Sequence, residues 1–145
     1  MSAETEDRVV PGRCYCGGVT FEVTLPSRFC AHCHCGNCRR AHGAAFVTYA
    51  GFPERQFALT GGGDLLVRYR TETGATRSFC RRCGTTLLYE GPRWAGEVHV
   101  ARACIDGEID RAPEAHVEVD NKATWWTFDD HLPRLGGTSG SEKKP

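Results

Sequence analysis

Apolar and polar residues alternate in short stretches along much of the chain. From Val19 to Leu25 every second residue is apolar, which is the period of a half-buried strand. Shorter stretches of the same kind predict further strands over residues 29–33, 45–50, 65–70, 76–79, 85–89 and 97–103. One helical turn is expected over residues 39–42, because Gly43 can end it. The pattern predicts a mainly β protein with few, short helical turns.

The length of the chain, 145 residues, is typical of one domain that can bury a sizeable core. Residues 1–8 are polar and are expected to form a flexible N-terminus. Residues 136–145 are rich in Gly, Ser and Lys and are expected to form a disordered tail. The folded domain is therefore expected to span residues 9–135.

The charges of the chain balance, with 18 Lys and Arg residues against 18 Asp and Glu residues. Proteins that bind nucleic acid usually carry a basic excess, so a nucleic-acid partner is not expected. No stretch approaches the ~18 apolar residues of a membrane span. The first ten residues are polar and lack the apolar segment of a signal peptide, so a membrane location is not expected either.

The nine cysteines are the main chemical feature of the sequence. They occur largely as C-x-C and C-x2-C pairs, a spacing that is typical of metal knuckles. Zinc binds thiolate sulfur at about 2.3 Å and is satisfied by four ligands. A disulfide framework is the alternative, but it normally accompanies a signal peptide. We therefore expect zinc and a reducing compartment, which makes the cytoplasm the expected location.

Two of the cysteine pairs lie far apart in the sequence. Cys14 and Cys16 form the first pair, and Cys80 and Cys83 form the second, with 63 residues between them. Together they supply the four thiolates of a closed zinc site, which has no room for a substrate. A zinc ion there would join the first strand to the hairpin at residues 65–79, so we expect a structural role.

A second cluster consists of Cys33, Cys35 and Cys38. Three thiolates on one short loop can face a single ion, and an ion with three protein ligands and an open position is typical of a catalytic zinc. The alternative is a second closed site with a fourth ligand from the same region, for which the candidates are Cys30, His32, His34 and His42. We expect the open arrangement, and therefore two zinc ions per chain.

Arg39 and Arg40 follow this cluster directly. Three thiolates leave a zinc complex with a net charge of minus one, which two guanidinium groups can offset. The same groups can contact a carboxylate of a thiol substrate. The alternative is that both arginines belong to a solvated face.

One cysteine, Cys104, is left over from both clusters. A buried free cysteine often serves as a small hydrophobic residue. The segment from Arg102 to Asp106 also faintly resembles the active-site segment of zinc-bearing methionine sulfoxide reductases of the B type. A redox role for Cys104 is therefore kept as an alternative.

Three motifs occur in a fixed order along the chain, namely Cys14-x-Cys16-Gly17-Gly18-Val19, Cys33-His34-Cys35-x-x-Cys38-Arg39-Arg40 and Phe79-Cys80-x-x-Cys83-Gly84. In this order they resemble the glutathione-dependent formaldehyde-activating enzyme family, which includes centromere protein V. The resemblance covers about residues 9–135 and extends to four features near the C-terminus, namely His116, Lys122, Trp125 and Asp130-His131-Leu132-Pro133.

The resemblance implies several small coiled antiparallel sheets built around zinc. It implies that Cys14, Cys16, Cys80 and Cys83 hold a structural zinc and that Cys33, Cys35 and Cys38 hold an exchangeable, catalytic one. The implied activity is that of a carbon–sulfur lyase or synthase, which adds a small thiol such as glutathione to formaldehyde and yields S-(hydroxymethyl)glutathione.

Two other functions stay open on the sequence alone. One is a zinc-stabilised binding module without catalysis, as in centromere protein V, and the other is a thiol redox enzyme that uses Cys104. The residues also leave open which thiol and which aldehyde would react, and which oligomeric state the protein adopts.

Overall fold

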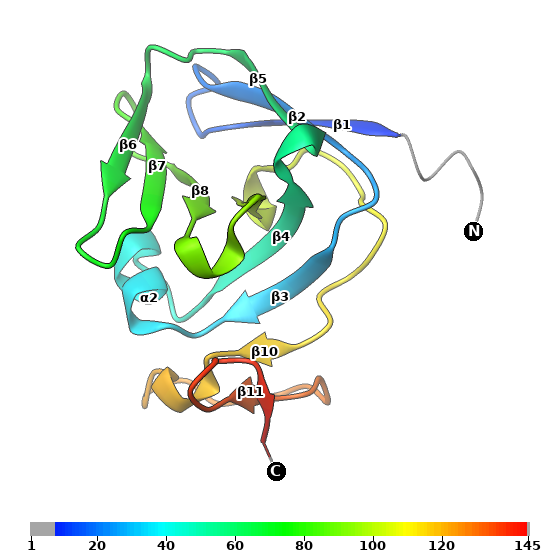
Figure 1. Ribbon diagram of the computed structural model, residues 1–145, viewed down its shortest axis with the longest axis vertical. Coiled ribbons are helices and arrows are strands. Elements are labelled where there is room, and N and C mark those ends of the chain that lie inside the picture. The colour runs from blue at the N-terminus through cyan, green and yellow to red at the C-terminus, as the bar shows by residue number, and fades with distance from the viewer. Residues whose placement is uncertain (1–7, 145) are drawn as a thin grey trace.

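The computed structural model of the protein describes residues 8–144 (Figure 1). Residues 1–7 of the segment that was expected to be flexible lie outside the described residues, as does Pro145. Within residues 8–144 the chain forms twelve strands, one α-helix and four short 3-10 helices. The 3-10 helices are η1 (Glu54–Gln56), η2 (Pro92–Trp94), η3 (Arg102–Cys104) and η4 (Val119–Asn121). The prediction of a mainly β protein with few helical turns is confirmed.

The largest sheet has seven strands in the order β10-β3-β4-β9-β8-β7-β6, so it is larger than the sheets that the resemblance implied. In that order the strands are His116–Val117, Phe29–Cys33, Val47–Pro53, Glu97–Ala101, Thr86–Glu90, Thr76–Cys80 and Leu66–Arg70. All neighbours are antiparallel except β10, which pairs in parallel with β3.

One strand of this sheet extends beyond its predicted end. The sequence pattern predicted a strand over residues 45–50, yet β4 continues through Gly51 to Pro53. The ring of Phe29 on the paired strand β3 occupies the space that a side chain at position 51 would need. Glycine is therefore required here for close packing between the strands and not for a turn.

A second, smaller sheet contains three antiparallel strands in the order β1-β2-β5. These strands are Val9–Arg13, Thr20–Thr24 and Phe57–Gly61. In β2 the side chains of Phe21 and Val23 are buried, while Thr20, Glu22 and Thr24 are more exposed. The alternation that the sequence shows is therefore the alternation between core and surface.

The helix α2 spans Gly36–His42, which is longer than the predicted turn over residues 39–42. It ends at Gly43, whose φ of 61° and ψ of 42° are left-handed, as expected of a glycine at this position. The helix follows Cys35 directly and buries Cys38 on its inner face. The second cysteine cluster is thus placed at the N-terminal end of α2.

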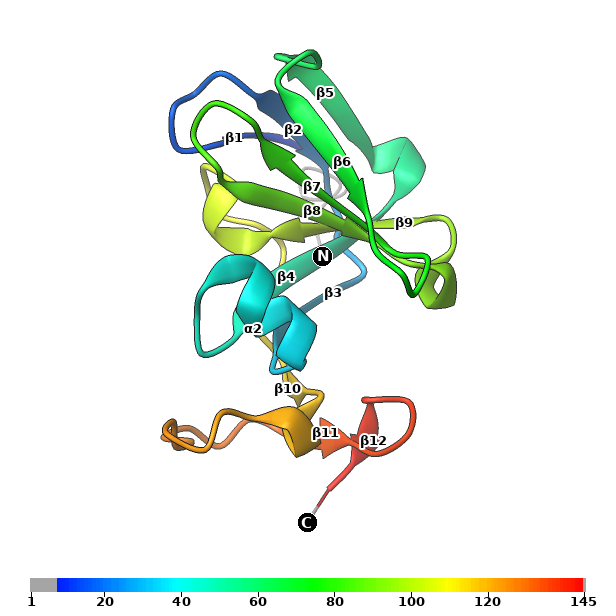
Figure 2. The same ribbon diagram turned by 90° about the vertical axis from the view of Figure 1, so that its left-hand side faces the viewer.

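The C-terminal part of the chain forms a layer below β10 in Figures 1 and 2. It includes the antiparallel pair β11 (Leu135–Gly136) and β12 (Glu142–Lys143), although composition suggested disorder for residues 136–145. Polar contacts hold this segment, because the Asp120 carboxylate accepts the Gly137 N–H at 2.8 Å and lies 3.4 Å from the Lys144 ammonium. Composition alone does not reveal such contacts.

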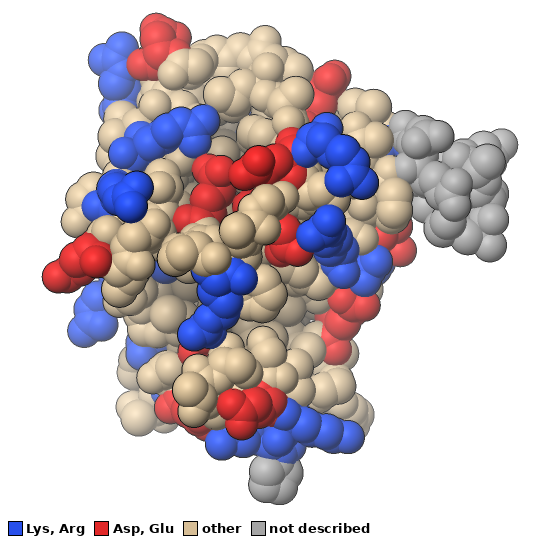
Figure 3. Space-filling model, in the orientation of Figure 1, with Lys and Arg blue, Asp and Glu red and all other residues tan. Residues whose placement is uncertain are grey.

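Charged side chains of both signs are interspersed over the face shown in Figure 3, in agreement with the balanced charge of the chain. Among the described residues, no helix has the length and apolar character that crossing a membrane requires.

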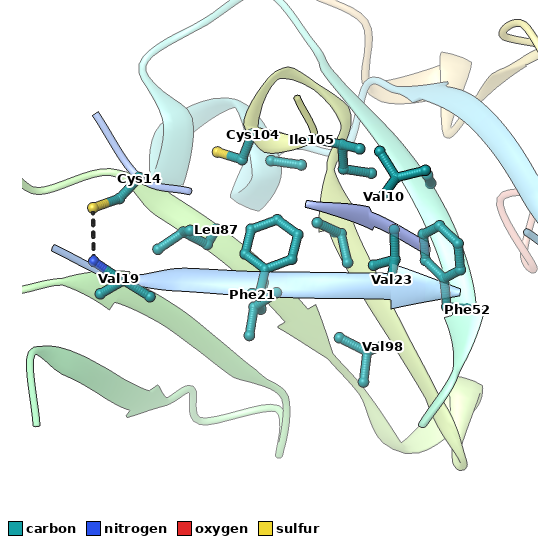
Figure 4. Close-up of a cluster of buried hydrophobic side chains, with 14 of the residues drawn as sticks. Val10, Cys14, Val19, Phe21, Val23, Phe52, Leu87, Val98, Cys104 and Ile105 are labelled. Carbon is teal, nitrogen blue, oxygen red and sulfur yellow. Dashed lines mark hydrogen bonds between the residues drawn. The ribbon is translucent and has the colours of Figure 1, made fainter. Parts of the chain in front are cut away.

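Side chains from both larger sheets meet in one core (Figure 4). Phe21 and Phe52 are its largest fully buried members, and burial of one such side chain contributes about 1.5–3 kcal/mol. Three cysteines belong to this core as well, namely Cys14, Cys80 and Cys104. The first cysteine cluster therefore lies at the edge of the core, between segments that are distant in sequence.

Candidate functional site

The fold brings together the four cysteines of the first predicted site. Their sulfur atoms all lie within 4.8 Å of one another. The Cys14 and Cys16 sulfurs are 3.6 Å apart, and the Cys16 and Cys80 sulfurs are 3.8 Å apart. The first pair lies in the connection between β1 and β2, and Cys80 ends β7, so this cluster joins the two larger sheets.

Hydrogen-bond donors surround these sulfurs. The N–H of Val19 donates to the Cys14 Sγ at 3.3 Å (Figure 4), and the N–H of Gly18 donates to the Cys16 Sγ at 3.4 Å. The Arg82 Nε donates to the same Cys16 Sγ at 3.3 Å. The Gly18 bond, followed by the Arg82 bond, lowers the pKa of Cys16. Burial instead raises the pKa of Cys80. Four sulfur donors this close together form a ligand set that fits zinc.

The second cluster is less compact. Cys33 ends β3 and Cys38 lies in α2, and their sulfurs are 3.7 Å apart. Metal-ligand atoms in proteins include His nitrogens, Cys sulfurs and carboxylate oxygens. Among residues 8–144, the first cluster is the one group of three or more of these atoms that all lie within 4.8 Å of one another. The structure therefore brings the sulfurs of Cys33 and Cys38 together. When the Cys35 sulfur is included, the three sulfurs of this cluster are spread more widely than those of the first cluster.

A pocket of about 600 Å³ opens beside this second cluster, a volume within the usual range for small-molecule sites. All three cysteines, Cys33, Cys35 and Cys38, line it, and none of the four cysteines of the first cluster does. Its remaining walls come from the large sheet, from η2 and from the C-terminal segment. The two clusters therefore differ in that the second one borders this pocket and the first does not.

An arginine that the sequence analysis did not single out approaches the second cluster. The Arg77 Nη2 donates to the Cys38 Sγ at 3.5 Å, and the Arg77 Nη1 donates to the Tyr49 hydroxyl at 3.3 Å. The Arg77 guanidinium carbon also lies 4.7 Å from the centroid of the Tyr89 ring. These contacts fix one positive charge beside a sulfur of the cluster.

The predicted pair of arginines lies elsewhere. The Arg39 Nη2 donates to the backbone oxygen of Asn121 at 3.1 Å, and neither Arg39 nor Arg40 lines the pocket. Both follow Cys38 in α2, and each residue of an α-helix is rotated by about 100° from the one before. Because Cys38 points inward, the next two side chains leave the helix in other directions. Among residues 8–144 neither guanidinium is hydrogen-bonded to a sulfur of the cluster, so the expectation that this pair offsets the thiolate charge stays a prediction.

Tyr49 is a second neighbour that the sequence did not indicate. Its hydroxyl donates to the Cys38 Sγ at 3.8 Å and lies 3.3 Å from the His42 Nε2. Burial, followed by the nearby Cys38, raises the pKa of Tyr49, so the phenol stays protonated and can donate a hydrogen bond. Burial lowers the pKa of His42 to about 4, which keeps that ring neutral near pH 7.

The candidates for a fourth ligand have other partners or are enclosed. His42 contacts Tyr49 as described, and the His32 Nδ1 lies 2.8 Å from the Thr48 hydroxyl. The His34 Nε2 lies 2.8 Å from the His116 Nδ1. Cys30 borders the pocket but is fully buried, and burial raises the pKa of its thiol. These contacts favour the open arrangement over a second closed site.

Cys104 is remote from this chemistry. Only 8% of its surface is exposed, and it lines neither the pocket beside the second cluster nor a second pocket of similar volume. Burial is the main cause that raises the pKa of Cys104 to about 11. A nucleophilic cysteine needs an accessible thiolate, so these observations favour a packing role over a redox role.

Comparisons with known proteins identify similar chains. The family model of the glutathione-dependent formaldehyde-activating enzyme matches residues 9–121. A curated protein of Halomonas elongata, named "Putative glutathione-dependent formaldehyde-activating enzyme", is 31% identical over 124 residues, which cover 81% of this chain and 79% of that protein. An uncharacterized lyase of Schizosaccharomyces pombe is 23% identical over 117 residues, which cover 81% of this chain and 83% of the relative.

A solved structure resembles this fold as well. It is the crystal structure of a Rhodobacter sphaeroides protein, with a TM-score of 0.59 and 29% sequence identity. The likeness covers 69% of this chain and 91% of that one. Much of the fold described above is therefore shared with an experimentally determined structure.

Proposed function

The chain belongs to the glutathione-dependent formaldehyde-activating enzyme family, and from this premise we propose that it is a zinc-dependent carbon–sulfur lyase or synthase. The activity we propose is most like that of an S-(hydroxymethyl)glutathione synthase, which acts on a small thiol and formaldehyde or on their adduct. Cys14, Cys16, Cys80 and Cys83 hold a structural zinc in this proposal. Cys33, Cys35 and Cys38 hold the catalytic one.

The observation that carries this proposal is that a pocket borders the second cluster and not the first. Cys33, Cys35 and Cys38 line a pocket of about 600 Å³, and the four other cysteines do not. A zinc ion with three protein ligands can also take a ligand from the substrate, whereas four thiolates complete the coordination of a structural ion.

Zinc bound by these three cysteines would favour the thiolate form of a substrate and polarise a carbonyl oxygen. The chain supplies the remaining groups of the site. Arg77 brings a positive charge to the Cys38 sulfur, where it offsets the charge of the thiolates. Tyr49 lines the pocket, and we assign its protonated hydroxyl, which would turn from the Cys38 sulfur, as the donor to the oxygen of the aldehyde.

The reaction is an addition without a change of oxidation state overall. The substrate loses its S–H bond and forms an S–C bond to the aldehyde carbon. The C=O double bond becomes a C–O single bond, and the proton released by the thiol balances the one that the new hydroxyl gains. No external oxidant or reductant is needed.

The size of the pocket and its charges support a thiol as large as glutathione. About 600 Å³ is far more than formaldehyde alone requires. Arg77 and Arg93 on the lining can contact carboxylates, and Glu114 and Glu118 can contact an ammonium group. A tripeptide thiol that carries two carboxylates and one ammonium group complements this lining.

The cytoplasm is the location that we propose, because all nine cysteines are free thiols in the structure and such thiols persist in a reducing compartment.

The test is the rate of hydroxymethyl adduct formation from glutathione and formaldehyde, followed by NMR with the zinc-loaded protein. A parallel reaction without protein is essential, because thiols and formaldehyde combine spontaneously. We expect acceleration over this control. Acceleration with another thiol but not with glutathione would keep the mechanism and discard the substrate, while no acceleration with any thiol would remove the enzyme proposal.

A further inference from the structure

A series of three polar side chains, of which two are buried, lies next to the second cysteine cluster. The His34 Nε2 is 2.8 Å from the His116 Nδ1. The His116 Nε2 is in turn 3.0 Å and 3.2 Å from the two carboxylate oxygens of Asp130. His34 is 0% exposed and His116 is 1% exposed. His34 stands between Cys33 and Cys35, so this series begins inside the candidate metal-binding loop.

The carboxylate fixes the direction of the hydrogen bonds. An ionised Asp130 only accepts, so the His116 Nε2 must carry a hydrogen. In a neutral His116 ring the Nδ1 is then an acceptor, and the His34 Nε2 donates to it. The remaining nitrogen, the His34 Nδ1, is buried without a partner, which is consistent with a bare acceptor and not with a second N–H. Each ring therefore has one tautomer that satisfies the series.

Aromatic rings enclose the two histidines. The His34 ring centroid is 5.0 Å from that of Phe46 and 5.2 Å from that of Trp126, and the His116 centroid is 4.8 Å from that of Phe128. Hydrogen bonds are electrostatically stronger in such apolar surroundings than in water. Packing and hydrogen bonding together therefore hold both imidazole rings in one orientation.

The main chain holds the same loop from the same side. The short strand β10 pairs in parallel with β3, with His116 opposite His32, and the N–H of His34 donates to the backbone oxygen of Val117 at 3.0 Å. Asp130 lies beyond the residues 9–121 that the family model matches. A segment outside that match is thus linked to the metal-binding loop.

We propose that His34, His116 and Asp130 are positioning residues that hold the loop of Cys33 and Cys35 in the geometry required for metal binding, with Asp130 as the outer anchor. This proposal rests on the proposed function, because it assumes that the loop binds a metal ion. A site of this kind depends on supporting residues that are themselves locked by packing and hydrogen bonds. None of the three needs to contact the substrate.

Three variants of the full chain test the proposal. His116→Phe keeps a ring within the aromatic cluster but removes both nitrogens, and Asp130→Ala removes the outer anchor, which is partly exposed. Asp129→Ala is the matched control, because it removes the same charge at the exposed neighbouring position. The first measurement is the rate at which a chelator removes the more weakly held zinc, with retention of the other zinc as the check of folding.

We expect this zinc to be lost on the order of 10-fold faster from His116→Phe and Asp130→Ala, as is typical when supporting groups around a metal site are removed. The control should match the unaltered protein. Equal rates in Asp130→Ala and Asp129→Ala would overturn the proposal. If His116→Phe fails to fold, Asp130→Ala decides, because its side chain lies at the outer end of the series.

A second measurement separates this proposal from the proposed function. Hydrogen exchange of the backbone amides at residues 33–38 is compared after the weakly held zinc has been removed. The amides of this segment should exchange several-fold faster in Asp130→Ala than in Asp129→Ala. This result is expected even if the unaltered protein binds only one metal ion and the enzyme proposal fails. Unchanged exchange would overturn the positioning role whatever the activity of the protein.

Discussion

The guanidinium of Arg77 and the sulfur of Cys38 are in direct contact, with the Nη2 donating to the Sγ at 3.5 Å. The two residues come from β7 and α2 and are 39 positions apart in the sequence. A second hydrogen bond from Arg77 to the Tyr49 hydroxyl fixes the direction of the guanidinium. Among the described residues, the guanidinium that is hydrogen-bonded to a sulfur of this cluster therefore comes from the sheet and not from the helix that carries Cys38.

Replacement of Arg77 should weaken metal binding at the second cluster. Arg77→Gln removes a hydrogen bond from a charged donor, which contributes roughly 1.5–3 kcal/mol, so the affinity for this zinc should fall about tenfold or more. Competition with a chelator measures the change. Arg40→Gln removes an equal charge at an exposed position outside the pocket, and it should behave as the unaltered protein. Equal losses in both variants would contradict the specific role of Arg77.

Elemental analysis should find two zinc ions per chain, with different affinities. The first cluster holds four sulfurs within 4.8 Å of one another, while the second has three cysteines at a pocket. A site with fewer protein ligands loses its ion more readily, so mild chelation should remove about one zinc and leave the fold intact. Only one bound metal in a folded, fully reduced protein would refute the assignment of two sites.

The two clusters should also differ in their effect on folding. Cys80→Ser should unfold or aggregate the protein, because Cys80 is fully buried in the core and its site joins distant segments, and metal binding at such a site is coupled to folding. Cys35→Ser should keep the fold and lose one zinc. Circular dichroism and zinc content distinguish these results, and equal disorder in both variants would argue against the division into structural and catalytic sites.

Gly51→Ala should lower the stability of the protein. A Cβ at position 51 would overlap the ring of Phe29, and overpacking of a core typically costs about 1–3 kcal/mol. Each kcal/mol corresponds to roughly 2–4 °C in the midpoint of thermal unfolding for a chain slightly larger than this one. Gly63→Ala is the control, because a Cβ there meets no atom within 4 Å. A midpoint unchanged in both variants would show that β3 and β4 adjust freely.

The sequence predicts features that depend on local pattern. Alternation predicted β2 because its period is that of a half-buried strand, and the spacing of the cysteines predicted that Cys14 and Cys16 would meet Cys80 and Cys83, because a closed zinc site needs four ligands. The contact of Arg77 with Cys38 depends instead on how β7 packs against α2, and no local signal marks Arg77 among the arginines of the chain. The contact between His116 and His34 likewise follows from the parallel pairing of β10 with β3. Because β10 has only two residues, the sequence gives no pattern from which this pairing could be predicted.

The activity itself should separate the enzyme proposal from the redox alternative. Cys35 borders the pocket, and we assign it to the catalytic zinc, so Cys35→Ser should abolish the acceleration of adduct formation from glutathione and formaldehyde. Cys104 is buried and borders neither pocket, so Cys104→Ala should keep nearly the full rate, with alanine chosen because it adds no buried hydroxyl. A redox enzyme would give the opposite result, since Cys104 would then be the nucleophile. NMR of the hydroxymethyl product decides between the two functions. The rate of the uncatalysed reaction is subtracted, and the zinc content of each variant is measured. Full activity in Cys35→Ser together with its loss in Cys104→Ala would exclude the mechanism proposed here.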